Sequence, residues 1–172
     1  MRFEYRSSVR ILLAFMCVAC SRAADRSSKT AEGTDTSFAS MQARGNMAMG
    51  VDQATSTHKF DALPHGGRIE LQRDVNDSLG IAQIRAHLRL IQHAFQAGDF
   101  STPEFVHMQT MPGTAVMAQK RDVITYTYHE LPRGGEVVMQ TSDSSALGAI
   151  HEFMGAQRMG HHATGAGSTA HD

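Results

Sequence analysis

The chain has 172 residues and a formal net charge of −1, with 16 Lys and Arg against 17 Asp and Glu. No concentrated basic stretch is present, which argues against a nucleic-acid partner because phosphate binding needs a cationic face. The only two cysteines, Cys17 and Cys20, lie close to the N-terminus. A disulfide or a thiolate metal site is therefore excluded from the rest of the chain.

The first residues have the order of a bacterial export signal. Arg2, Arg6 and Arg10 precede an apolar run at residues 11–19, which is about half the length of a membrane-spanning helix. Residues 18–20, Val-Ala-Cys, resemble the lipobox of bacterial lipoproteins. In that family the cysteine is acylated before cleavage and becomes the first residue of the processed protein.

We therefore predict a signal peptide of the lipoprotein type at residues 1–20 and a lipid anchor on Cys20, with ordinary cleavage after Ala23 as the alternative. The protein is expected to be exported to the periplasm or anchored to the outer membrane, so that the membrane is one partner through the lipid. Removal of the leader takes away three Arg and one Glu, which leaves 13 basic and 16 acidic residues. The processed chain is thus mildly acidic.

Composition also predicts where the chain folds. Residues 21–56 are mostly small and polar, and we predict a disordered linker there because such a segment cannot offset its own ordering entropy. Residues 161–172 are rich in Gly, Ala and His, and they are predicted to form a disordered tail. A single domain is expected at residues 57–160.

An internal repeat predicts the fold of this domain. Residues 57–72 are echoed at residues 125–140, and both copies contain Leu-Pro-x-Gly-Gly at their centre. Proline and glycine are typical of a tight hairpin connection, in which glycine accepts a positive φ, and apolar residues alternate on both sides of the motif. Each copy is therefore predicted to be a β-hairpin.

A helix is predicted after each hairpin. N-cap residues occur at Asp77-Ser78 and at Asp143-Ser144. Apolar side chains then recur at three- and four-residue spacing. In the first copy this pattern continues to Phe95, whereas in the second copy the last turns are more polar and His161 stands at the equivalent position.

The two repeat units, at residues 57–97 and 123–160, give the element order ββαββα. This order predicts an α+β fold in which a four-stranded antiparallel sheet has both helices on one face. The connector between the units is predicted to contain a short helix over residues 114–121.

Histidine and methionine provide the main candidate chemistry. The chain has ten His and 11 Met. Imidazole with thioether is the ligand set expected for copper, while imidazole alone also suits zinc. The candidates beside the two predicted helices and in their connector are His87, His107, His151 and His161, and we predict that two or three of them converge on copper or zinc. The alternative is that these are unligated histidines at the edge of the core.

No specific catalytic motif is present. The sequence has no Gly-x-Ser-x-Gly, no cysteine in the predicted domain and no glycine-rich loop between a strand and a helix. Its carboxylates are scattered and are expected to be caps or surface groups. Enzymatic activity therefore has no residue pattern in its favour beyond a histidine that could act as a general base.

Five stretches carry a resemblance to known sequences: residues 66–71, 84–88, 98–103, 106–107 and 149–153. On these stretches, residues 57–162 resemble an uncharacterised family of small bacterial exported proteins and lipoproteins. The resemblance implies a shared fold and no established activity. Some members carry an aspartate carbamoyltransferase label, but the phosphate-binding Ser-Thr-Arg-Thr of that enzyme is missing here, because Ser101-Thr102 is followed by Pro103.

Three functions remain open at this point. The leading hypothesis is a non-enzymatic envelope protein that binds a transition metal through its histidines. The first alternative is an interaction module that docks another envelope protein through its bare sheet face or an edge strand. The second is a small enzyme with a histidine as general base.

Overall fold

The structure is a computed structural model that describes residues 37–163. The predicted signal peptide with Cys20, the first part of the predicted linker and most of the predicted tail lie outside these residues. The elements along the described chain are α1 (Phe38–Met49), the 3-10 turn η1 (Gln53–Thr55), β1 (Ser56–Leu63), β2 (Gly66–Arg73), α2 (Ser78–Gln96), α3 (Ser101–His107), α4 (Thr114–Gln119), the 3-10 turn η2 (Arg121–Val123), β3 (Thr125–Leu131), β4 (Gly134–Gln140) and α5 (Ser144–His161).

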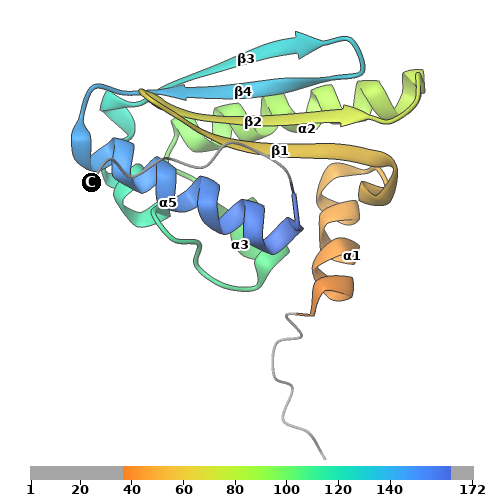
Figure 1. The fold of residues 1–172 in the computed structure, drawn as a ribbon, viewed down its shortest axis with the longest axis horizontal. Helices are drawn as coiled ribbons and strands as arrows, with labels where there is room; N and C mark the ends of the chain where they lie inside the picture. The colour runs from red at the N-terminus through yellow and green to blue at the C-terminus, as the bar shows by residue number, and fades with distance from the viewer. Residues whose placement is uncertain (1–36, 164–172) are drawn as a thin grey trace, which may run out of the picture. The chain divides into compact units, whose positions relative to one another are not determined.

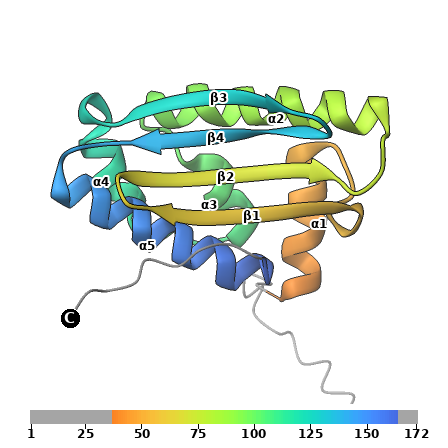
Figure 2. The ribbon, with the colours of Figure 1, turned by 45° about the horizontal axis from the view of Figure 1, so that its top comes forward.

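The four strands form one antiparallel sheet in the order β1-β2-β4-β3. Helices α2 and α5 both lie against the same face of this sheet (Figures 1 and 2). Each helix packs mainly on the hairpin of the other repeat unit, α2 on β3 and β4 and α5 on β1 and β2. The predicted α+β fold with its ββαββα order is thereby confirmed. Because each helix packs on the hairpin of the other unit, the two repeat units share one hydrophobic core.

The repeated Gly-Gly pairs let the two central strands approach each other closely. A Cβ atom at Gly66 would collide with the carbonyl oxygen of Met139, and one at Gly134 would collide with that of Leu71. Of the four repeated glycines only Gly66 has a positive φ. The glycines are therefore required mainly by the contact between β2 and β4, and only to a small extent by the turn conformation that the sequence suggested.

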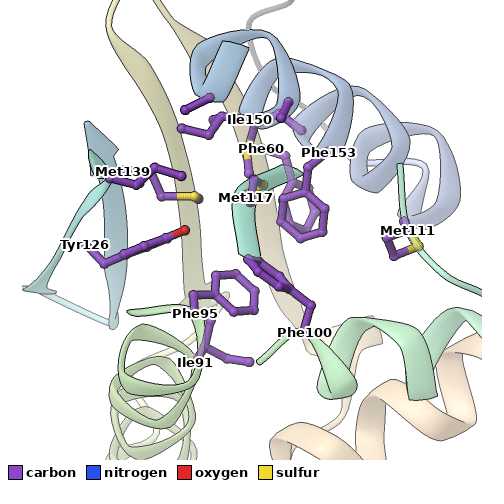
Figure 3. Close-up of a cluster of buried hydrophobic side chains, with 14 residues drawn as sticks. Phe60, Ile91, Phe95, Phe100, Met111, Met117, Tyr126, Met139, Ile150 and Phe153 are labelled. Carbon is purple, nitrogen blue, oxygen red and sulfur yellow. The ribbon is translucent and has the colours of Figure 1, made fainter. Parts of the chain in front are cut away.

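A cluster of buried aromatic and thioether side chains fills the space between the sheet and its helices (Figure 3). Phe95 from α2 contacts Phe153 from α5 edge to face, with ring centroids 5.8 Å apart, and Phe100 packs against both. Met117 and Met139 in the same cluster are completely buried. Met117 lies on α4, so the short helix predicted in the connector is present and contributes to the core.

Helix α1 lies in the segment for which the sequence predicted a disordered linker. Ser37 Oγ accepts a hydrogen bond from the Ser40 amide at its start, and Gly50 ends it in the left-handed conformation. Its buried residues, Met41, Gly45 and Met49, recur every four residues and include only two apolar side chains. That stripe is too weak to stand out in the sequence, and the helix is stabilised by contacts with α2, α3 and α5.

We expect the substitution Gly113→Ala to lower the free energy of unfolding by more than about 2 kcal/mol. Gly113 begins α4 with a φ of 81°, and a Cβ atom there would overlap the backbone carbonyl of Ala149 in α5. Urea unfolding checks the result. Gly148→Ala is the matched control, because nothing lies within 4 Å of its added methyl group and a helical alanine is favoured over glycine. Equal stability of the two variants would contradict the prediction.

None of the helices between residues 37 and 163 is long and apolar enough to cross a membrane.

Candidate functional site

Four histidines from four different elements line one partly open cavity of about 80 Å³. His58 comes from β1, His87 from α2, His107 from α3 and His161 from α5. The wall is otherwise largely apolar, and its larger side chains include Met49, Phe60, Leu88, Ile91, Phe95 and Phe153. The fold therefore gathers imidazoles from distant parts of the sequence at one edge of the core.

His58 and His161 are the two cavity histidines whose arrangement best suits a shared ligand. Their ring centroids are 5.7 Å apart and the ring planes are inclined by 36°. His58 Nε2 and His161 Nδ1 are both buried and both lack a hydrogen-bond partner. An unpaired buried polar atom costs about 1–3 kcal/mol, so two neighbouring ones require an explanation.

The same two rings also line a second, more polar pocket of about 180 Å³ on their outer side. Gln42 of α1 and Gln53 of η1 are among its other lining residues. Gln42 Oε1 is buried without a partner, as are the two imidazole nitrogens. Three polar atoms that lack partners thus belong to side chains lining one pocket, which is the environment of a bound ion or of ordered water.

His107 is held in place by a buried amide. Its Nε2 lies 3.2 Å from Gln157 Oε1, and both residues are less than 10% exposed. Because an amide oxygen only accepts, Nε2 carries the proton and Nδ1 keeps its lone pair. The ring stands perpendicular to that of His161 at 5.0 Å, in space that Gly160 leaves open, since a Cβ atom there would lie 2.5 Å from His107 Cε1.

Burial keeps these rings neutral near pH 7. It lowers the pKa of His58 to about 4, with a further contribution from His87. Burial, together with the neighbouring His58 and His107, lowers the pKa of His161 to about 3. Burial also lowers the pKa of His87 to about 4, although a hydrogen bond with the Ala48 backbone acts in the opposite direction. Neutral imidazole is the form that binds metal ions.

The structure brings together three of the four histidines that the sequence singled out. His87, His107 and His161 line the cavity. His151 does not reach it, because its Nε2 hydrogen-bonds with the Leu63 carbonyl at 2.9 Å, beside the first hairpin turn. His58 takes its place, although the sequence analysis did not select it.

A comparison of the two repeat units shows that the fold does not need imidazoles at this position. The repeat aligns His58 with Tyr126, and the helical stripes align His161 with Phe95. Tyr126 and Phe95 are both buried and pack edge to face, with ring centroids 6.2 Å apart. The contact between α2 and β3 therefore has an aromatic pair where the equivalent contact between α5 and β1 has two histidines.

Among the described residues, no group of three or more His, Cys, Asp or Glu side chains is arranged to hold a metal ion. The candidate centre therefore consists of the two imidazoles of His58 and His161, with the Gln42 amide oxygen nearby. No protein-family model, curated protein or solved structure matches the chain. Function is therefore argued from this site alone, and the resemblance to exported proteins stays a prediction.

Proposed function

We propose that this protein is a non-enzymatic binding protein of the bacterial cell envelope that holds one transition-metal ion, copper or zinc, between His58 and His161. The observation that carries the proposal is the pair of buried, unpartnered nitrogens, His58 Nε2 and His161 Nδ1, in neighbouring rings. The envelope location is supported by the order of the N-terminal residues, which is that of an export signal with a lipobox.

The spacing of the two rings suits a shared ion. A metal lies about 2 Å from each imidazole nitrogen, which places the centroids of two ligating rings about 5–6 Å apart for tetrahedral to linear geometry. The observed separation of 5.7 Å falls in that range. The separation of the two rings is therefore compatible with one ion between them.

Neighbouring groups would support such a centre. Ligating histidines in proteins are commonly oriented and packed by a surrounding shell of hydrogen bonds and apolar side chains. Phe60 stacks on His161 at 5.4 Å, and His107, oriented by Gln157, packs against His161 edge to face at 5.0 Å. These contacts hold the His161 ring in a single orientation.

The size and lining of the cavity favour binding of an ion over binding of an organic cofactor. Pockets for organic ligands usually have about 300–1,000 Å³, several times the 80 Å³ found here. The single acidic lining residue, Glu70, has its carboxylate bound by Lys59 Nζ at 3.0 Å and Gln72 Nε2 at 2.8 Å. These two hydrogen bonds, both to Oε1, give the one lining carboxylate a structural role, which favours a binding function over acid–base catalysis.

Equilibrium dialysis of the full chain against copper and against zinc tests the proposal. Cys17 and Cys20 are replaced by Ser in every sample, because two cysteines at this spacing bind soft metals themselves. We expect one equivalent of at least one of the two metals to bind. His58→Phe with His161→Phe should abolish this binding.

The matched control removes two exposed histidines, His93→Phe with His129→Phe, and should leave the bound equivalent unchanged. Retention of the metal by the first double variant, or its loss from the control, would refute the proposal. Circular dichroism of both variants verifies that they are folded.

A further inference from the structure

We infer that the ion held by His58 and His161 is the soft monovalent ion Cu(I), in preference to divalent zinc or copper. The inference rests on the proposed function and goes further, because it names the charge and the oxidation state of the bound metal. Three features of the site support it: the neutrality of its donor atoms, the small number of its strong ligands and the apolar wall behind them.

The buried donor atoms without a hydrogen-bond partner at the two pockets carry no negative charge. They are two neutral imidazoles and the amide oxygen of Gln42. The nearest acidic groups are engaged elsewhere: Glu70 binds Lys59, and Asp74 accepts a hydrogen bond from Thr57 Oγ1 at 2.8 Å. Because the desolvation cost of an ion grows with the square of its charge, a divalent ion costs about four times as much to bury here as a monovalent one.

The number of strong ligands also separates the candidates. Zinc in proteins is almost always bound by four ligands in structural sites and by three ligands plus water in catalytic sites. Two imidazoles with no third histidine or carboxylate in position do not meet that requirement within the described residues. Cu(I) is satisfied by two nitrogen ligands, and the 5.7 Å separation of the rings lies between the values for tetrahedral and linear binding of a shared ion.

The inner wall would keep the ion in its reduced state. Phe60, Phe153 and Ile91 line the cavity on the side facing the core, together with the soft thioether of Met49. Cu(II) prefers a tetragonal set of nitrogen and oxygen ligands, which this wall cannot provide. Thioether donors, in contrast, favour Cu(I).

Competition titrations without oxygen test the inference on the full chain with Cys17→Ser and Cys20→Ser. Cu(I) is supplied with ascorbate and a chromogenic chelator, Ag(I) serves as a redox-inert monovalent probe, and Zn²⁺ is titrated in parallel. We expect one equivalent of Cu(I) and of Ag(I) to bind at least 100-fold more tightly than Zn²⁺. His58→Phe with His161→Phe should remove the binding of both monovalent ions.

The substitution Gln42→Glu tests the charge argument directly. A carboxylate at this position should raise the affinity for Zn²⁺ at least tenfold and change that for Cu(I) by less than threefold. Zn²⁺ binding as tightly as Cu(I) in the unsubstituted pocket would overturn the inference and leave the proposed function standing. Failure of every ion to bind would overturn both. An unchanged Zn²⁺ affinity in Gln42→Glu would refute the charge argument.

Discussion

The metal-free protein is expected to become more stable, by about 2 kcal/mol, when His58 and His161 are both replaced by phenylalanine. The substitution removes the two unpartnered buried nitrogens, each of which costs about 1–3 kcal/mol. The phenylalanine rings are larger than imidazole, and the strain of fitting them offsets part of this gain. The equivalent contact between α2 and β3 shows that aromatic rings fit between a helix and an outer strand, since Phe95 and Tyr126 form such a pair there. Urea unfolding in the presence of a chelator measures the change.

The surface double variant His93→Phe with His129→Phe is again the control, and its stability should stay within about 0.5 kcal/mol of the unsubstituted protein. A loss of stability in the His58 and His161 variant would contradict the prediction. It would mean that the imidazoles contribute to the metal-free fold, for example through ordered water, and are not kept for a ligand.

Metal should reverse this order of stability. An ion that binds only the folded chain stabilises it by about 4 kcal/mol when its free concentration is 1,000 times Kd. The unsubstituted protein gains this stabilisation from ion binding, and the variant with two phenylalanines does not. If the unsubstituted protein is less stable than the phenylalanine variant without the ion and more stable with it, then His58 and His161 lower the packing stability and provide ion binding. This result would explain why histidines stand at positions where the equivalent contact has Phe95 and Tyr126.

The fold could be predicted because the repeat contains most of its determinants locally. Each copy has a turn that contains proline, alternating strands and an amphipathic helix that follows an Asp-Ser pair, and two such copies have few ways to pack. Helix α1 could not be found in the same way. Its stripe of Met41, Gly45 and Met49 is weakly apolar, and its position depends on contacts such as the hydrogen bond from Arg44 Nε to the Val106 carbonyl at 2.8 Å.

The candidate site was only partly predictable for a related reason. Helical spacing places His161 on the core side of α5, and it is there. His58 was recognisable in principle, because it alternates with Phe60 and aligns with the buried Tyr126. His151 lies on the flank of the same helix, and only the tertiary packing decides that this flank faces the Leu63 carbonyl at the hairpin end, away from the cavity.

Mild acid is expected to destabilise the metal-free protein, starting near pH 6.5. Histidines of an unfolded chain bind protons with a pKa of about 6.5. In the folded protein burial lowers the pKa of His58 and His87 to about 4 and that of His161 to about 3. Between these values the unfolded state holds more protons, so the stabilisation present above pH 6.5 is lost as the pH falls towards 4. Each such histidine contributes a slope of up to about 1.4 kcal/mol per pH unit.

The variant with phenylalanine at positions 58 and 161 provides the comparison that assigns this slope. It retains only His87 and His107 of the four histidines whose pKa burial lowers, so its free energy of unfolding should fall less steeply between pH 6.5 and pH 4.5. Urea unfolding at several pH values in this window measures both slopes, and carboxylate titration affects the two proteins equally. Parallel curves would contradict the prediction, because the imidazoles of His58 and His161 would then be hydrated in the folded state. Their hydration would also remove the reason for expecting a dry, neutral metal site.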